Sequence, residues 1–266
     1  MSALTSPFVP GRCALIGMVH LLPLPGSPGW GGDMAQLLAR AKTDAARLVE
    51  GGCDALLVEN MGDLPYLRGA VEPATVAAMA LATAAVVDLG LPTGVQVLAG
   101  ANQEALGVAV AAGANFLRVE GFAYGHLADE GWLDACAGPL LRRRAALGAK
   151  GVQIFADVRK KHAAHAATAD LSLRALCEGY AFCGADGLII TGESTGKAAR
   201  LADVVEAKAA GLPVLVGSGI TEANIAEFGA VADAVIVGTS IKVGGDWRAP
   251  VEVTRVRRLR SALDRG

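Results

Sequence analysis

The chain has 266 residues and a mass of 27.0 kDa, a length that allows one large domain or two small ones. Apolar residues make up 53% of it and the mean hydropathy is +0.42, which excludes a disordered chain and supplies a sizeable core. The 24 Lys and Arg residues nearly balance the 26 Asp and Glu residues, for a formal charge of −2. Without a basic excess to pair with a phosphate backbone, we expect no nucleic-acid partner.

Membrane insertion and secretion are also disfavoured. The longest weakly polar stretch, residues 76–87, ends at Asp88, well short of the roughly 20 residues that a spanning helix needs. The opening MSALTSPFVPGRC contains no apolar segment typical of a signal peptide. The five cysteines show no C-x-x-C spacing, which favours reduced thiols over disulfides or zinc ligands. We therefore expect a cytoplasmic protein with no membrane-inserted part.

Eight short apolar runs, bounded by Gly, Pro or Asp, predict the strands. Near-continuous apolar runs are typical of strands buried on both faces of a parallel sheet. The runs cover residues 14–19, 55–58, 94–98, 116–119, 152–156, 187–190, 214–216 and 234–237. Segments with helical periodicity lie between them. Asp33 is placed to cap one helix that ends at Gly51, and Pro73 opens the next at its first position.

One connector between helix and strand occurs four times. It reads Gly-Gly-Cys-Asp at 51–54, Gly-Ala-Asn at 113–115, Gly-Ala-Asp at 184–186 and Val-Ala-Asp at 231–233. Such repetition indicates one repeated βα unit of roughly 31 residues. Eight units of this size in about 250 residues predict an α/β fold, a single (β/α)8 TIM barrel. With no linker or change in composition to mark a boundary, we assign residues 1–266 to one domain.

In a TIM barrel the active site forms at the carboxyl ends of the strands, and ionisable residues follow several of the predicted strands. A carboxylate there can act as a general acid or base once desolvation or a neighbouring cation tunes its pKa. Asp157 is the leading candidate, and Lys161 is a Schiff-base or electrostatic group. Some of these residues also have non-catalytic interpretations. The basic residues after Asp157 are also consistent with a solvated loop, and Glu59 and Glu120 with structural ion pairs. The candidate catalytic residues are His20, Glu59, Glu120, Asp157, Lys161 and His162.

The loops after the last two predicted strands favour phosphate binding. Gly217-Ser218-Gly219 follows the seventh run and is expected to lead into a helix, and Gly238-Thr239-Ser240 follows the eighth. Glycines let backbone N–H groups approach an anion, and the hydroxyls add donors. Many TIM barrels bind a substrate phosphate at these two loops, although tight turns alone would explain the pattern. Thr191 and Gly192, after the sixth run, can extend the cradle. The segment from Thr191 to Lys197 lacks the spacing of a P-loop.

A metal site is the less favoured hypothesis for the histidines. His162 and His165 stand at i, i+3 and can face one ion, with Glu59, Asp63 or His20 as further ligands. No strict ligand motif accompanies them, so we expect no metal and no cofactor.

Several motifs resemble the BtpA/SgcQ family. The longest is Ile16-Gly-Met-Val-His-Leu-Leu-Pro-Leu-Pro-Gly-Ser-Pro28. Further matches are Val-Glu-Asn-Met-Gly-Asp at 58–63 with Pro-Tyr at 65–66, Ala-Asp-Val at 156–158 with Lys-His at 161–162, Ile-Thr-Gly at 190–192 with Thr-Gly at 195–196, Val-Gly-Ser-Gly at 216–219, and Val-Gly-Thr-Ser at 237–240 with Lys242. The resemblance implies a phosphate-binding TIM barrel of the ribulose-phosphate-binding kind. The chain departs from the family at Val97–Asn102, where an Asn-rich segment is usual, and at Glu120, where an Asn is usual. Both departures bear on the substrate.

From these patterns we expect an enzyme that acts by acid–base chemistry on a small phosphorylated metabolite such as a sugar phosphate. Isomerisation, epimerisation and aldol-type cleavage all fit a proton shuttle between Asp157 and one of His20, Glu59 or Glu120. The alternative is a non-catalytic assembly factor for a membrane or photosystem complex, in keeping with the biogenesis role for which some family members are named. The Ala-rich outer helices suit packing between subunits as well as packing within one chain, and we expect a homo-oligomer.

Overall fold

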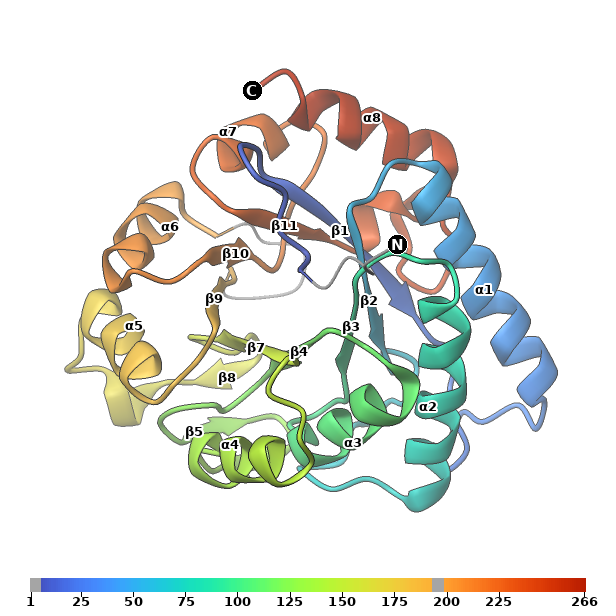
Figure 1. Ribbon diagram of the computed structural model, residues 1–266, viewed down its shortest axis with the longest axis horizontal. Coiled ribbons are helices and arrows are strands. Elements are labelled where there is room, and N and C mark those ends of the chain that lie inside the picture. Colours follow the sequence, from blue (N-terminus) through green and yellow to red (C-terminus); the bar gives the residue numbers. More distant parts are fainter. Residues whose placement is uncertain (1–5, 193–198) are drawn as a thin grey trace.

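The computed structural model describes residues 6–192 and 199–266. Eight parallel strands close into a barrel in the order β1-β11-β10-β9-β7-β4-β3-β2 (Figure 1). They are β1 (Ala14–His20), β2 (Ala55–Glu59), β3 (Thr93–Gln96), β4 (Phe116–Val119), β7 (Gln153–Asp157), β9 (Gly187–Ile190), β10 (Val214–Val216) and β11 (Ala234–Val237). The expected TIM barrel is confirmed, and each strand contains most of one predicted apolar run.

Helices surround the barrel and alternate with its strands (Figure 1). They are α1 (Met34–Glu50), α2 (Pro73–Val87), α3 (Asn102–Ala112), α4 (Ala137–Ala146), α5 (Leu173–Phe182), α6 (Leu201–Ala207), α7 (Ile225–Gly229) and α8 (Val253–Leu263). Local sequence explains how α1 begins and what it buries. The Asp33 carboxylate accepts the Gln36 N–H at 2.9 Å, and Leu37, Ala41 and Leu48 are buried.

Two phenylalanines fill the centre of the barrel. Phe116 and Phe155 lie with ring centroids 5.3 Å apart, and both are buried. A Cβ at Gly94 would come 2.1 Å from Phe116, and one at Gly187 would come 2.8 Å from Phe155. Glycines on neighbouring strands therefore make the space that the two rings need, as expected where small and large residues alternate inside a small barrel.

The strand ends differ slightly from the predicted runs. β1, β2 and β7 each run one residue further, because His20 pairs with Glu59 in the β1–β2 ladder and Asp157 pairs with Ile189 in the β7–β9 ladder. Three predicted catalytic residues are therefore held by strand hydrogen bonding at the rim of the barrel. β3 ends at Gln96, two residues before the predicted end at Leu98.

A second, three-stranded antiparallel sheet was not predicted. It has the order β6-β5-β8 and joins β5 (His126–Ala128), β6 (Gly131–Leu133) and β8 (Ala163–Ala164). We call it the accessory sheet. It comes from the loops that follow β4 and β7, so it stands beside the carboxyl ends of those strands. Within residues 6–192 and 199–266, no helix is both long enough and apolar enough to cross a membrane.

Candidate active site

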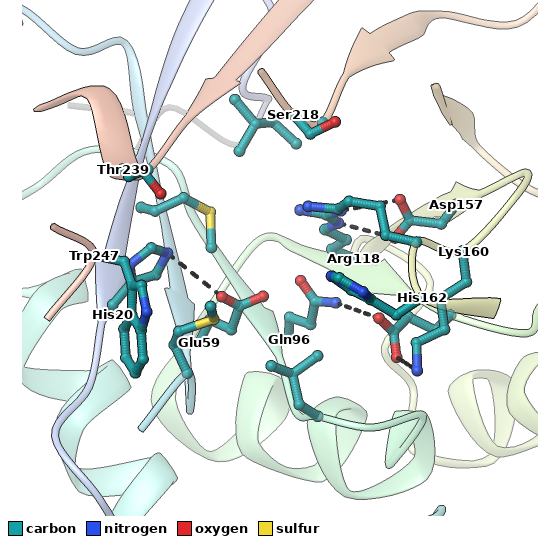
Figure 2. Close-up of a pocket in the computed structure, with 18 of the residues that line it drawn as sticks. His20, Glu59, Gln96, Arg118, Asp157, Lys160, His162, Ser218, Thr239 and Trp247 are labelled. Atoms are coloured by element: carbon teal, nitrogen blue, oxygen red, sulfur yellow. Dashed lines mark hydrogen bonds and ion pairs between the residues drawn. The ribbon is translucent and has the colours of Figure 1, made fainter. Parts of the chain in front are cut away.

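A cavity of about 550 Å³ opens at the carboxyl ends of the barrel strands (Figure 2). It brings together residues that are far apart in the sequence. All six predicted catalytic residues and six of the eight predicted phosphate-binding residues line it. These are His20, Glu59, Glu120, Asp157, Lys161, His162, Gly217, Ser218, Gly219, Gly238, Thr239 and Ser240.

A buried ion pair joins β4 to β7 at the wall of this cavity. Arg118 Nε donates to Asp157 Oδ2 at 2.9 Å, and Arg118 Nη2 donates to Asp157 Oδ1 at 3.0 Å. Burial acts to lower the pKa of Arg118, but Asp157 outweighs it and the net shift is upward, so the guanidinium stays charged. The bidentate geometry occupies both Asp157 oxygens. Sequence reasoning did not single out Arg118, although an arginine inside the apolar run 116–119 is itself a signal, because arginine is rarely fully buried unless paired.

Arg118 also reaches the loop after β10. A Cβ built on Gly217 would lie 3.2 Å from Arg118 Nη2 and 2.5 Å from the Ile189 side chain. Glycine is therefore required at position 217 for the guanidinium and the loop to approach each other. The arrangement places a permanent cation against one of the two predicted phosphate loops.

Glu120 is buried, and three polar side chains contact it, two at the carboxyl and one at the backbone carbonyl. Gln96 Nε2 donates to its Oε1 at 3.4 Å, and Lys160 Nζ lies 3.8 Å from its Oε2. Asn102 fixes the backbone by donating to the Glu120 carbonyl at 2.7 Å. Burial raises the pKa of Glu120 to about 7, and Lys160 partly opposes that shift. A carboxyl that titrates near neutrality can both accept and donate a proton at physiological pH.

Lys160 lies among carboxylates and is not part of a solvated basic loop. Its side chain is 7% exposed and pairs with Glu130, and it also lies 3.9 Å from Asp129. Arg159, by contrast, is exposed. The accessory sheet explains the difference, because Asp129 and Glu130 form the turn between β5 and β6 and bring two acids to Lys160.

Lys161 presents an amine to the cavity. Among the described residues it makes no hydrogen bond and no ion pair, and burial lowers its pKa, with Arg118 acting in the same direction. Asp157, Glu59 and Glu120 act on that pKa in the opposite direction. At neutral pH an amine of this kind is unprotonated, and therefore nucleophilic, for a larger fraction of the time than a solvated lysine.

His162 and His165 do not converge on a common point. His162 has a left-handed backbone (φ 53°) and lines the cavity (Figure 2). His165 Nε2 is instead 3.0 Å from the Lys160 carbonyl, and its ring lies 5.3 Å from that of His126. Within the described residues, no three His, Cys, Asp or Glu side chains are grouped to hold a metal ion.

His20 and Glu59 form a second polar pair across the β1–β2 ladder. His20 Nε2 lies 3.5 Å from Glu59 Oε2, and both side chains are 7% exposed. Burial lowers the pKa of His20 to about 3, with Lys242 acting in the same direction, so the imidazole is neutral at pH 7. Burial also raises the pKa of Glu59. A Cβ at Gly238 would lie 3.0 Å from His20 Cε1, so a side chain there would press on the ring.

The two predicted phosphate loops face the cavity with a mixed set of donors. Gly219 has a left-handed backbone (φ 70°), and Asn224 closes the loop by donating to the Gly219 carbonyl at 2.9 Å. Ser240 Oγ is buried with no hydrogen-bond partner among the described residues. The helix expected to follow Gly219 begins only at Ile225 and has five residues, so the loop does not run directly into a helix N-terminus. The available donors are backbone N–H groups, hydroxyls and Arg118.

Thr191 and Gly192, the other two predicted phosphate-binding residues, lie outside the cavity lining. The Thr191 hydroxyl donates to the Arg159 carbonyl at 2.9 Å, and the Gly192 N–H donates to Ser218 Oγ at 2.9 Å. Neither residue lines the cavity, and Gly192 instead supports Ser218. The rest of the sequence motif, Glu193 to Lys197, lies outside the described residues.

Two other residues of the family motifs are structural. Asp63 accepts the Leu24 N–H at 2.7 Å and the Asn60 amide at 2.9 Å, which ties the loop after β2 to the loop after β1. Lys242 is fully buried, with its Nζ 3.2 Å from Asp44 on α1. This pair anchors the chain directly after Thr239 and Ser240.

The fold and this polar rim define a TIM barrel of the class whose site is built at the carboxyl ends of the strands. Among solved structures, the chain is similar to KGPDC from Streptococcus mutans, with a TM-score of 0.63, 12% identity, and coverage of 95% of this chain and 98% of that one. It is also similar to phosphoribosyl anthranilate isomerase from Thermus thermophilus, with a TM-score of 0.57, 16% identity and coverage of 95% and 98%. At these identities the likeness concerns the fold.

The chain belongs to the BtpA family, whose model matches residues 12–265. It is 42% identical over 255 residues to a mitochondrial protein of Caenorhabditis elegans, covering 93% of this chain and 92% of the relative. It is 37% identical over 255 residues to the photosystem I biogenesis protein BtpA of Synechocystis, covering 95% and 88%. The family resemblance found in the sequence is confirmed.

Proposed function

We propose that this chain is an enzyme that moves a proton on a small phosphorylated metabolite such as a sugar phosphate, as an isomerase, an epimerase or an aldol-type lyase. One observation carries the proposal. A carboxyl with a pKa of about 7, Glu120, and an amine with a lowered pKa, Lys161, line the same cavity as two glycine- and hydroxyl-rich loops. Groups with perturbed pKa values gathered in a cleft are typical of catalytic sites.

The phosphate end of the cavity is assigned to the loops after β10 and β11. Their backbone N–H groups and hydroxyls supply neutral donors, and Arg118 supplies charge beside Gly217. Asp157 uses two of the five guanidinium N–H donors, so others remain for an anion. The name of the Thermus thermophilus isomerase mentions a phosphoribosyl compound, which supports a phosphorylated ligand for a barrel of the same fold.

Glu120 is assigned the proton transfer. As a base it takes a proton from a carbon next to a carbonyl or imine, and the electron pair moves onto the oxygen or nitrogen. Lys161 stabilises that developing charge, either as an ammonium or as a protonated Schiff base, which forms with the carbonyl by loss of water and is hydrolysed to release the product. Return of the proton from Glu120 to the neighbouring carbon gives the isomer, and delivery of a proton to the opposite face of the original carbon by a second acid–base pair gives the epimer. His20 with Glu59 is the second acid–base pair.

Asp157 has a different role in this proposal from the one its sequence position predicts. Both of its oxygens accept hydrogen bonds from Arg118, so the carboxylate is engaged in a bidentate pair with the guanidinium. Asp157 therefore acts as a positioning residue that holds Arg118 toward the phosphate.

Solvent exchange tests the proton transfer even while the product is unidentified. Sugar phosphates are incubated with the protein in D2O, and the proton next to the carbonyl is followed by NMR. We expect one or more ketose or aldose phosphates to lose that proton signal, and we expect Glu120→Gln to slow the exchange by at least about 100-fold. Glu178→Gln, on the exposed face of α5, is the matched control and should exchange normally. Undiminished exchange in Glu120→Gln would remove Glu120 from the mechanism.

A non-catalytic role is the second candidate, and one specific observation favours it. Leu127 and Trp132 are directly opposed in the accessory sheet and are 51% and 46% exposed, which gives an apolar pair for a partner protein. The name of the Synechocystis relative points to photosystem I biogenesis. In a host that needs the protein, an assembly factor would tolerate Glu120→Gln and fail with Leu127→Lys, whereas an enzyme would show the opposite pattern.

A further inference from the structure

A second chamber of about 220 Å³ adjoins the main cavity. The two share His20, Leu64, Trp247 and Arg248 along their common border. The chamber lies between the loops that follow β1, β2 and β11. Its remaining walls are Leu21, Leu22, Pro23 and Gly62, so it is mainly apolar, whereas the main cavity is rich in ionisable groups.

The walls of this chamber are fixed by packing and hydrogen bonds. Gly62 is in such close contact with the loop after β1 that a Cβ there would lie 2.6 Å from the backbone nitrogen of Pro23. Asp63 holds the same two loops together by accepting the Leu24 N–H. The proline ring further limits the conformations of this loop. A chamber with walls of this kind is formed before any ligand arrives, so binding costs little ordering entropy.

Planar groups mark the border between the chamber and the main cavity. The Arg248 guanidinium lies 4.4 Å above the Trp247 ring. The His20 ring meets Trp247 edge-on, with centroids 6.4 Å apart, and Figure 2 shows the two side chains together below Thr239. Indole and guanidinium planes are the surfaces on which flat ring systems stack.

A phosphorylated sugar alone leaves this chamber unused. Its hydroxyls would meet leucine and proline walls, where buried hydroxyls without partners are costly. The size fits an aromatic ring, since an apolar cavity of about 150 Å³ is enough to bind benzene. The apolar walls and the uncharged imidazole of His20 favour an uncharged ring, and the Arg248 guanidinium at the border disfavours a cationic one.

Resting on the proposed phosphate site, we infer that the substrate is a phosphorylated sugar that carries a planar, uncharged ring, such as a nucleobase or an aryl group, and that this ring occupies the chamber beside Trp247. The phosphate would lie against the loops after β10 and β11. The sugar would then lie between them, facing Glu59 and Glu120. Trp247 is assigned as the residue that recognises the ring.

Binding of matched ligands tests this inference. Ribose 5-phosphate, uridine 5′-monophosphate and adenosine 5′-monophosphate share a phosphorylated ribose and differ in the ring. Their dissociation constants are measured by calorimetry on the whole protein, with quenching of tryptophan fluorescence as a second signal. We expect the ring to tighten binding by about tenfold or more, the size typical of base–aromatic stacking. The two nucleotides distinguish a one-ring from a two-ring occupant.

Variants of Trp247 separate stacking from general damage. Trp247→Leu keeps an apolar side chain and should bring the ratio between nucleotide and ribose 5-phosphate close to one. Trp247→Phe keeps an aromatic face and should retain most of the ratio. Trp30→Leu, at a tryptophan that lines neither cavity, should leave the ratio unchanged.

Each outcome has a definite meaning. If ribose 5-phosphate binds and neither nucleotide binds more tightly, the inference about the ring is overturned and the proposed phosphate site stands. If the ratio survives Trp247→Leu, the ring lies elsewhere and the inference is also overturned. If ribose 5-phosphate and both nucleotides fail to bind, the proposed phosphate site fails, and the inference fails with it.

Discussion

At the scale of a single residue, burial shifts the pKa of the Glu120 carboxyl. Its side chain is 8% exposed and accepts a hydrogen bond from the neutral amide of Gln96. Desolvation disfavours the charged form, and the cation Lys160 at 3.8 Å offsets only part of that cost. The resulting pKa of about 7 is a property of the folded chain, because an unfolded glutamate titrates at 4.5.

This difference predicts a pH-dependent effect of Glu120→Gln on stability. Between pH 4.5 and 7 the folded protein holds a proton on Glu120 that the unfolded chain has released, so folding stability falls as the pH rises through this window. Glutamine removes that fall. The free energy of unfolding of the variant minus that of the wild type should therefore be about 3 kcal/mol larger at about pH 8 than at about pH 4.5. The figure follows from the shift from 4.5 to about 7, since one pKa unit corresponds to about 1.4 kcal/mol. Urea denaturation of both proteins at the two pH values measures it, and an equal difference at both would contradict the shifted pKa.

The Arg118–Asp157 pair predicts non-additive mutations. Arg118→Met leaves the Asp157 carboxylate buried without its partner. Asp157→Leu likewise leaves the Arg118 guanidinium buried without a counter-charge. Each single variant should lose about 3–5 kcal/mol of stability. The double variant should lose less than the sum, because the uncompensated charge is gone. A double-mutant cycle by urea denaturation measures the coupling, and additive losses would show that the pair contributes no energetic coupling.

At the scale of elements, α1 fastens the end of the last barrel loop. Asp44 on this helix accepts hydrogen bonds from the Val251 N–H at 2.8 Å and from Lys242 Nζ at 3.2 Å. Both Asp44 and Lys242 are fully buried. The segment from Thr239 to Val251, which includes Trp247, is thus tied at both ends, by β11 and by α1.

Asp44→Ala should therefore be far more damaging than loss of the cap of the same helix. It leaves the Lys242 ammonium buried without its counter-charge, which should cost about 3–5 kcal/mol. Asp33→Ala removes one exposed capping hydrogen bond and should cost about 1 kcal/mol. Thermal and urea unfolding of the two variants compare these losses directly. A loss for Asp44→Ala no larger than that for Asp33→Ala would show that the buried pair is not an important anchor.

The elements also show which features local sequence can predict. The strands of the barrel were predictable because a doubly buried strand must be apolar along its whole length, as in β9 and β11. The accessory sheet was not, because its two- and three-residue strands include a pairing between loops more than 30 residues apart in the sequence, as Leu127 with Ala164. No local pattern encodes that pairing.

At the scale of the whole molecule, closure of the barrel turns scattered strand ends into one site. The repeated βα unit predicted the closure, and the rule that barrel sites lie at the carboxyl strand ends predicted the cavity-lining residues, including His20 and Glu120. The sequence did not predict which partner each side chain would take. Arg118 with Asp157, Lys160 with Glu130 and Lys242 with Asp44 are contacts between distant segments, fixed by barrel register and helix packing.

The most direct test of the proposed phosphate site is thermal unfolding with phosphorylated ligands and their unphosphorylated counterparts. Ribose 5-phosphate and inorganic phosphate are compared with ribose, in the wild type and in the double variant Ser218→Ala/Thr239→Val. A ligand at about 100 times its Kd stabilises by about 2.7 kcal/mol, so we expect Tm to rise by roughly 5–10 °C with the phosphorylated compound. Ribose should give no rise, and the double variant should lose it. The phosphate site is contradicted if no phosphorylated compound raises Tm, or if the double variant keeps the full rise.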